Sequence, residues 1–225
     1  MSIIQTTFPT NNVATNKTQL LAWLEANATD YFDSYDTEGD YIICKNGESN
    51  VIKIWYTAPY GSSEAYGFTL YNRYGSSVSC TNAFLISVAV KTSKGIFFRA
   101  QAVTGYSIYN DIFISKAENG HIAIAAICFE GAINSHYDRF RCYDFEDAPS
   151  IPVIYTSEQS NTANVVSRIS TRMAETSLTK IPFYDTVSHF TDVYQLVHNQ
   201  YYNVYGIINV DGVDYFTNGC IALGD

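Results

Sequence analysis

The sequence predicts a mainly β protein, an antiparallel β-sandwich-like domain with an N-terminal helix and a C-terminal β-meander. Two-residue turn signals, Asn46-Gly47 and Asp211-Gly212, each separate runs that are rich in β-branched and aromatic residues. Apolar side chains alternate with a period of two from Ala83 to Thr92, as on a strand with one buried face. Aromatic residues make up 15% of the 225 residues, and they pack well on pleated sheets.

The N-terminal region is expected to contain an arm and a helix. Residues 1–15 are polar and irregular, so they are expected to form an extended N-terminal arm. Thr15 or Asn16 can cap a helix that runs to about Ala28, with three leucines on one face. That helix is expected to dock on a sheet.

The central part of the chain is expected to consist of consecutive antiparallel strands joined by tight turns. The expected strands are Tyr41 to Lys45, Asn50 to Tyr56, Ala65 to Tyr74, Ala83 to Thr92, Ile96 to Thr104, Asp111 to Lys116 and His121 to Phe129. The last of these, HIAIAAICF, is apolar on both faces, which is typical of a central strand covered on both sides.

After Phe129 the alternation weakens. The stretch from Asn134 to Asp147 carries most of the charge density, and Val165 to Met173 has helical spacing. Two layers of antiparallel strands with one or two helices at the side satisfy this pattern. The expected division is residues 1–15 (arm), 16–156 (helix plus β domain) and 157–225 (a C-terminal β segment that can belong to the same domain). Short strands are expected at Val153 to Thr156 and, with Pro182 at a sheet edge, at Thr176 to Tyr184.

The end of the chain is expected to fold into three short strands. Asp211-Gly212 favours a type I′ hairpin between Gly206 to Val210 and Val213 to Thr217, because both turn residues must adopt positive φ. Asn218-Gly219 then turns the chain into Cys220 to Leu223. These strands form the predicted β-meander.

Composition excludes several classes of function. The formal charge is −9 and the 13 basic residues are scattered, so neither nucleic acid nor an anionic membrane surface is an expected partner. The longest apolar run, Ile122 to Phe129, is too short to span a bilayer, and the start has no secretory pattern. The five cysteines are an odd number without a C-x-x-C pair, which indicates buried reduced thiols and synthesis in the cytoplasm.

An aromatic group in the first half of the chain supplies the candidate ligand or interface residues. Exposed rings next to Asn and Ser side chains can stack on sugars or anchor a protein interface. The candidates are Trp55, Tyr56, Tyr60, Tyr66, Tyr71 and Tyr74.

Motifs for catalysis, metals or cofactors are weak, so neither an enzyme nor a cofactor is expected. The four histidines stand apart, and Asp36 to Asp40 lacks the glycine and glutamate positions of a calcium loop. Asp144, Glu146 and Asp147 are close in sequence, as the paired carboxylates of a glycosidase could be. A solvated acidic loop paired with arginines is the simpler interpretation.

The C-terminal segment resembles a known group of proteins. Val210-Asp211-Gly212-Val213, Tyr215-Phe216-Thr217-Asn218-Gly219 and Ile221-Ala222-Leu223-Gly224-Asp225, together with Thr179 to Tyr184, are similar to the C-termini of uncharacterised virion proteins. Those proteins are encoded in phages and prophages of low-GC Gram-positive gut bacteria. The resemblance implies a tail, baseplate or capsid-associated structural protein located in the virion, and it transfers no functional residue.

The leading hypothesis is therefore a non-enzymatic virion component that forms a homo-oligomer and docks on other virion proteins. Edge strands and the N-terminal arm would supply its contacts. The alternative is a module that recognises a cell-surface glycan through the aromatic candidates. A carbohydrate-cleaving enzyme with carboxylates near Asp144 is a third hypothesis.

Overall fold

The computed structural model describes residues 3–56, 66–80, 83–103, 109–130, 137–152, 155–157, 177–182, 189–197, 205–218 and 221–225. In these ranges the chain is mainly antiparallel β structure with one helix near the N-terminus, as predicted. The elements are β1 (Ile4–Thr7), α1 (Val13–Asn27), β2 (Ser34–Asp36), β3 (Tyr41–Asn46), β4 (Ser49–Trp55), β5 (Gly67–Tyr71), β6 (Ser77–Cys80), β7 (Phe84–Lys91), β8 (Gly95–Ala102), β9 (Tyr109–Lys116), β10 (Ile122–Glu130), β11 (Tyr137–Asp144), β12 (Tyr155–Ser157), β13 (Ser177–Pro182), β14 (His189–Val197), β15 (Gly206–Val210), β16 (Val213–Thr217) and β17 (Ile221–Gly224).

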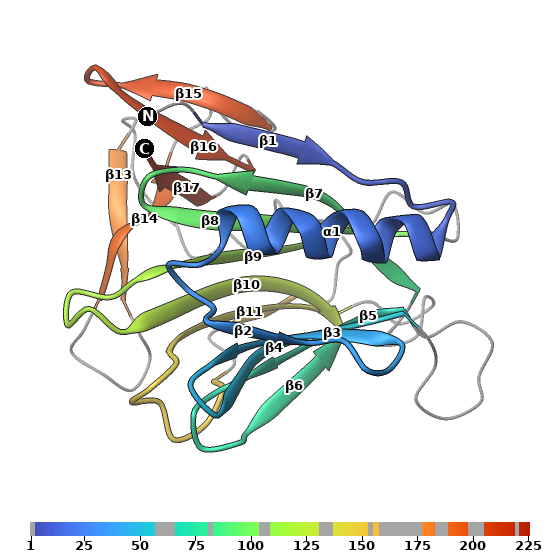
Figure 1. Cartoon of the computed structure of the whole chain (residues 1–225). Helices are drawn as coiled ribbons and strands as arrows, with labels where there is room; N and C mark the ends of the chain where they lie inside the picture. Colours follow the sequence, from blue (N-terminus) through green and yellow to red (C-terminus); the bar gives the residue numbers. More distant parts are fainter. Residues whose placement is uncertain are drawn as a thin grey trace.

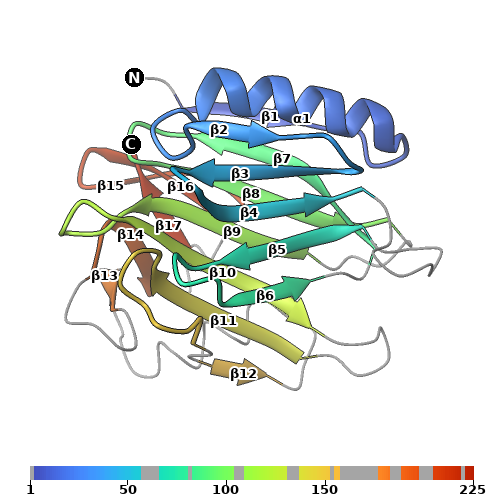
Figure 2. The ribbon, with the colours of Figure 1, turned by 60° about the horizontal axis from the view of Figure 1, so that its bottom comes forward.

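The strands form three sheets (Figures 1 and 2). The central sheet has the order β1-β7-β8-β9-β10-β11-β12. The N-terminal sheet, β2-β3-β4-β5-β6, packs with α1 against one face of the central sheet, and the C-terminal sheet, β13-β14-β17-β16-β15, packs against the other. The sandwich therefore has three layers of strands and not the two that the sequence suggested.

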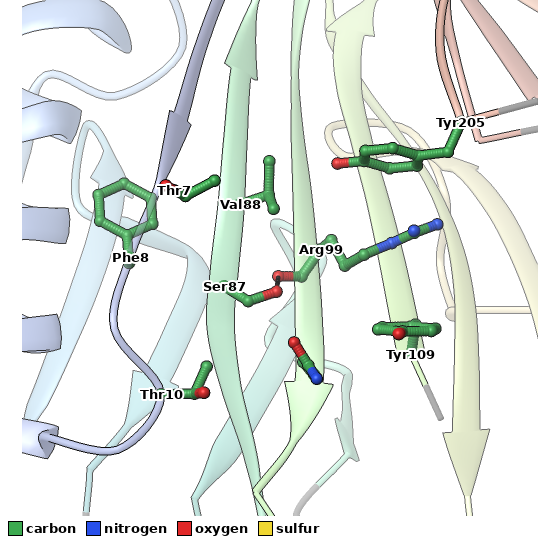
Figure 3. Close-up of a pocket in the computed structure, with 9 residues that line it drawn as sticks. Thr7, Phe8, Thr10, Ser87, Val88, Arg99, Tyr109 and Tyr205 are labelled. Carbon is green, nitrogen blue, oxygen red and sulfur yellow. Dashed lines mark hydrogen bonds between the residues drawn. The ribbon is translucent and has the colours of Figure 1, made fainter. Parts of the chain in front are cut away.

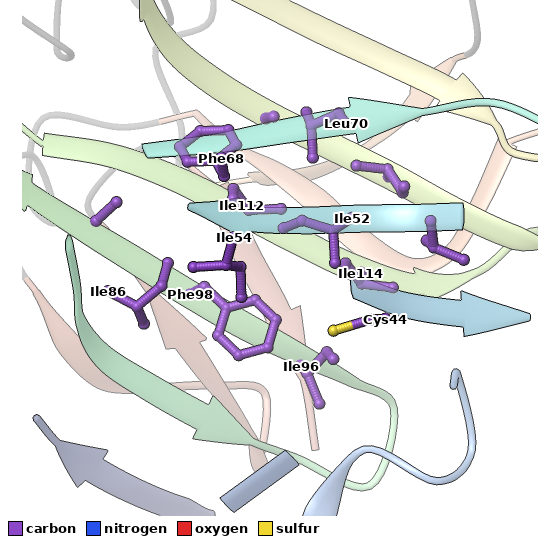
Figure 4. Close-up of a cluster of buried hydrophobic side chains, with 14 of the residues drawn as sticks. Cys44, Ile52, Ile54, Phe68, Leu70, Ile86, Ile96, Phe98, Ile112 and Ile114 are labelled. Atoms are coloured by element: carbon purple, nitrogen blue, oxygen red, sulfur yellow. The ribbon is translucent and has the colours of Figure 1, made fainter. Parts of the chain in front are cut away.

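The first core lies between the central sheet and the N-terminal sheet with α1. Figure 4 shows side chains of β3, β4 and β5 facing side chains of β7, β8 and β9. Leu20 and Leu24 of α1 are completely buried in the same core. Together these side chains form the larger of the two apolar clusters, Cys44, Ile52, Ile54, Phe68, Leu70, Ile86, Ile96, Phe98, Ile112 and Ile114 among them.

The second core lies between the central sheet and the C-terminal sheet, and β10 contributes to both cores. Ile122, Ile124 and Ala126 face the first core, whereas Ala123, Ala125 and Ile127 alternate with them and face the second. The prediction that HIAIAAICF is covered on both sides is confirmed. Such a strand is apolar on both faces because each face needs its own cover.

The predicted N-terminal arm, residues 1–15, contains a β-strand and the start of the helix. Ile4–Thr7 pair with β7 as the edge strand β1 of the central sheet. Asn12, and not Thr15 or Asn16, caps the helix, because its side chain accepts the backbone N–H of Thr15 at 3.0 Å. Helix α1 accordingly starts at Val13, two residues before the expected end of the arm.

The turn chemistry of the hairpins explains their registers. Asp211 and Gly212 have φ of 52° and 84°, which places the predicted β15–β16 hairpin in its expected register. In the β3–β4 hairpin the turn lies one residue later than expected, at Gly47 and Glu48, and only Gly47 has positive φ (57°). That is the pattern of a type II′ turn. Cys220 and the predicted second helix, Val165 to Met173, lie outside the described residues.

Besides β1, the strands β2, β6, β11 and β14 were not predicted from the sequence. The expected strand Ala65 to Tyr74 ends at Tyr71, and the chain turns into the short strand β6. The solvated loop expected at the acidic residues is wrong for Asp144, which ends strand β11 and is fully buried, whereas Glu146 and Asp147 lie in the turn that follows. Arg141 of β11 is only 4% exposed. The presence of charged residues was wrongly taken to indicate solvent exposure. Hydrogen bonds, such as that from Arg141 Nη1 to the Ile151 carbonyl (3.2 Å), make the burial of charged side chains possible.

The described cysteines agree with the sequence expectation. The thiols of Cys44, Cys80, Cys128 and Cys142 are buried and free, as predicted. Burial raises the pKa of the Cys44 and Cys142 thiols well above the ordinary value. No helix in the described part of the chain is long and apolar enough to span a membrane.

Candidate functional site

The structure separates the six aromatic candidates. Trp55 and Tyr56 are consecutive on β4 and its end, so their side chains point to opposite faces of the N-terminal sheet. Tyr56 is 3% exposed and lies in the first core, and its hydroxyl donates a hydrogen bond to Asn16. Tyr56 is therefore a core residue, and its assignment as a ligand or surface-interface residue was wrong.

The other candidates occupy different environments. Tyr71 shares the outer face of the N-terminal sheet with Trp55, because both alternate with core residues. Tyr66 is half-buried against the first core, and Tyr74 is exposed in the turn between β5 and β6. Tyr60 lies outside the described residues. The structure thus brings together only Trp55 and Tyr71 on one described surface.

Trp55 belongs to an organised cluster on that outer face. The Lys53 ammonium lies 4.0 Å from the ring centroid of Tyr41 and 3.7 Å from that of Trp55, which is cation–π geometry. Trp55 Nε1 donates to Thr69 Oγ1 at 2.8 Å, and Thr69 is 2.8 Å from Ser79 Oγ. Burial lowers the pKa of Lys53, against the opposing effect of Asp36. Thr69 is buried, so the cluster can offer aromatic edges and the exposed Ser79 hydroxyl to a ligand.

Sequence reasoning missed Tyr41 in this outer cluster. Tyr41 is the cross-strand partner of Trp55, and the two rings pack edge to face with centroids 6.2 Å apart. The predicted hairpin did not give this pairing, because a turn at Asn46-Gly47 would place Tyr41 opposite Ile52. The later turn and the register shift next to Cys44 bring Tyr41 opposite Trp55.

The ends of the sheets provide the second candidate surface. Each edge strand has backbone groups on one side without a strand partner, and natural proteins protect such edges with charge, proline, bulges or short length. Edge strand β13 carries Lys180, Pro182 and a bulge between them, whereas β2 and β12 are only three residues long. These edges are protected against pairing with another chain.

Edges β1, β6 and β15 lack that protection. Their sequences, IQTT, SVSC and GIINV, contain neither charge nor proline. Exposed apolar side chains lie on or beside β1 and β15, with Ile4 at 45%, Ile207 at 56% and Val213 at 42% exposure. Figure 1 shows β1 and β15 along the same upper border of the molecule. This border is suited to pairing with another strand.

A third group contains the carboxylates near Asp144. His121 Nδ1 lies 3.1 Å from Asp144 Oδ2 and 3.4 Å from Asp147 Oδ2. Asp144 also accepts the backbone N–H groups of Glu146 (2.8 Å) and Asp147 (3.1 Å) and the side chain of Asn119 (2.8 Å). Among the described residues, these His and Asp side chains alone place possible metal ligands within 4.8 Å of one another. Asp144 stabilises the turn after β11 through the backbone N–H groups of Glu146 and Asp147, and this structural role explains its position without a metal ion.

The fold and these surfaces define a class of protein, a three-layered antiparallel β scaffold with two unprotected sheet edges on one border. The chain matches no family model, and comparisons with curated proteins and with solved structures found no significant match.

Proposed function

We propose that this protein is a non-enzymatic structural component of a phage or phage-like particle, acting by self-association and by docking on neighbouring subunits. The observation that carries the proposal is the unprotected border formed by β1 and β15, with Ile4 and Ile207 exposed on the two strands. The resemblance of residues 210–225 to virion proteins supports the same function.

Strand addition is the mechanism that this border favours. An incoming strand would satisfy the free backbone groups of β15 while covering Ile207, which a monomer leaves in water. Because identical subunits associate with closed symmetry, a single such border can build a ring or a trimer. The two cores keep the sheets rigid, so an added strand would meet a preformed template.

Particle composition tests this proposal. Particles purified from a producing culture are analysed by quantitative mass spectrometry, with capsid and tail proteins as internal references. A fixed copy number of this chain per particle is the expected result. Its absence from particles, together with a monomeric purified protein, would overturn the proposal.

Glycan recognition is a second candidate function, and the outer cluster of Tyr41, Lys53, Trp55 and Thr69 favours it. Aromatic rings and hydroxyl groups that are already fixed by mutual contacts can bind a sugar at low entropic cost. A change in Trp55 fluorescence on adding glycans, abolished in Trp55→Phe, is expected for this function. No response to any glycan on an array would count against it.

A further inference from the structure

A pocket on the opposite side of the central sheet belongs to neither surface described above. It has a volume of about 320 Å³ and lies where the chain leaves β1, over β7, β8 and β9. Arg99 and Gln101 of β8 and Tyr109 of β9 line it, together with Thr10, Val88 and Tyr205 (Figure 3). Because Arg99 and Gln101 alternate with Phe98 and Ala100 of the first core, they face the C-terminal sheet.

The floor of the pocket is an internally neutralised ion pair. Arg99 donates from Nε to Asp111 Oδ1 and from Nη2 to Asp111 Oδ2, both at 2.7 Å. Asp111 is fully buried, and Asn218 donates to its Oδ2 at 2.9 Å. Since the two charges compensate each other, a charged ligand entering the pocket would lack a counter-charge there.

Two tyrosine rings enclose the Arg99 guanidinium. Its carbon lies 4.1 Å from the ring centroid of Tyr205 and 4.7 Å from that of Tyr109. Figure 3 shows the Arg99 side chain passing between these rings, with the Tyr205 hydroxyl directed toward Val88. The stacking holds the polar floor and the aromatic walls in one arrangement before any ligand arrives.

The Tyr205 hydroxyl is a buried polar group without a hydrogen-bond partner among the described residues. Its oxygen is shielded from solvent. Burial raises the pKa of Tyr205 to about 12, although Arg99 opposes the rise, so the phenol is neutral at pH 7 and can donate or accept. A buried hydroxyl without a partner is destabilising, and a rotation of the Tyr205 side chain that turned its oxygen into the pocket would let a hydroxylated ligand remove that cost.

We propose that this pocket binds a single neutral sugar ring. A sugar matches its chemistry, since hydroxyl groups can bond to Gln101 and Thr10 while the apolar ring face lies on Tyr109 and Val88. The volume lies at the small end of the range for ligand pockets, which suits one ring and excludes a longer chain from its interior. The proposal goes beyond particle assembly and does not depend on it, and its site differs from the outer cluster around Trp55.

Two variants change the pocket and leave both residues of the ion pair in place. Gln101→Leu removes an amide that can bond to the ligand, and Val88→Phe fills part of the volume. Trp55→Phe is the matched control, because it alters the aromatic cluster on the N-terminal sheet and leaves the pocket intact. Near-ultraviolet circular dichroism and the urea midpoint establish that each variant is folded.

Saturation-transfer NMR of the full chain with methyl glucoside, methyl galactoside and N-acetylglucosamine provides the test. We expect at least one sugar to bind, with about tenfold weaker affinity in Gln101→Leu, since one good hydrogen bond is worth about that factor, and with loss of binding in Val88→Phe. Binding should be unchanged in Trp55→Phe. Absence of binding by all three sugars, or binding that is lost in Trp55→Phe and kept in both pocket variants, would overturn the proposal.

Discussion

The hydroxyl of Tyr56 donates a 3.0 Å hydrogen bond to the side-chain oxygen of Asn16, and both residues lie inside the first core. The amide nitrogen of Asn16 in turn donates to the carbonyls of Pro9 (2.8 Å) and Ile86 (2.7 Å). One buried asparagine therefore connects helix α1 with the N-terminal sheet, with the segment before the helix and with the central sheet. A polar residue in an apolar core is tolerated because its groups have partners.

Removing the Tyr56 hydroxyl should destabilise the protein. Tyr56→Phe leaves the Asn16 oxygen without this donor in a buried site, so the free energy of unfolding should fall by about 1 to 3 kcal/mol. Urea denaturation measures the change. Tyr74→Phe is the control, because Tyr74 is 65% exposed and its loss should leave the midpoint within error. Equal midpoints for Tyr56→Phe and wild type would contradict the structural role.

The ion pair of Arg99 and Asp111 should show a rescue effect. Arg99→Met leaves the fully buried Asp111 carboxylate uncompensated and should cost about 3 to 5 kcal/mol of unfolding free energy. The double variant Arg99→Met/Asp111→Leu should recover much of that loss, because no charge stays buried. Chemical denaturation of the variants measures this coupling. A double variant less stable than Arg99→Met would exclude it.

The surface pair of Asp30 and Lys91 should contribute in a pH-dependent way. The hydrogen bond from Lys91 at 2.8 Å, followed by its charge, lowers the pKa of Asp30. A lowered carboxyl pKa stabilises the fold above the unfolded value of about 4, and this contribution disappears as the pH falls through the folded pKa. Because Asp30 is 69% exposed, Asp30→Asn should cost only about 0.5 kcal/mol at pH 7.

Denaturation at pH 7 and at pH 2.5 measures the effect of Asp30→Asn. The difference from wild type should vanish in acid and shrink in 0.5 M salt, which screens exposed charges. A difference that persists in acid would mean that the substitution acts through something other than this charge.

The β15 edge should control self-association. Ile207→Lys places a charge on an exposed position of an unprotected edge strand, so it should shift the oligomer toward the monomer in light-scattering measurements. The unfolding midpoint should change little, because Ile207 is 56% exposed. Tyr74→Lys adds the same charge at an exposed position away from β15 and should leave self-association unchanged. Equal oligomer distributions in both variants would remove β15 from the interface.

Local patterns predicted the parts of the fold that local physics determines. The C-terminal hairpin has its expected register because Asp211 and Gly212 adopt the positive φ that a type I′ turn requires. The double-sided apolar pattern of β10 identified the central strand, since burial on both faces leaves no polar alternation. Strand β11 was missed because part of what holds Arg141 and Asp144 in buried positions, the Ile151 carbonyl and the Asn119 side chain, lies 10 and 25 residues away and outside a short sequence window.

The candidate site was predicted only in part, for a related reason. Trp55 and Tyr56 were grouped together by proximity in the sequence, although a strand sends neighbouring side chains to opposite faces. The pocket was missed altogether, because it combines residues after β1 with β8, β9 and Tyr205. Long-range pairing brings these segments together, and no motif within any one of them indicates a pocket.

The pairing of β1 with β7 also constrains the order of folding. Ile4 pairs with Lys91, so β1 has no partner until the strands of the N-terminal sheet, which lie between β1 and β7 in the chain, have also been made. Closing the long loop between β1 and β7 costs conformational entropy before the pairing of the two strands can stabilise the fold. This cost slows folding. Until then β1 is an unprotected strand on a growing chain, and its lack of charge makes the nascent protein prone to pair with its neighbours before it is complete.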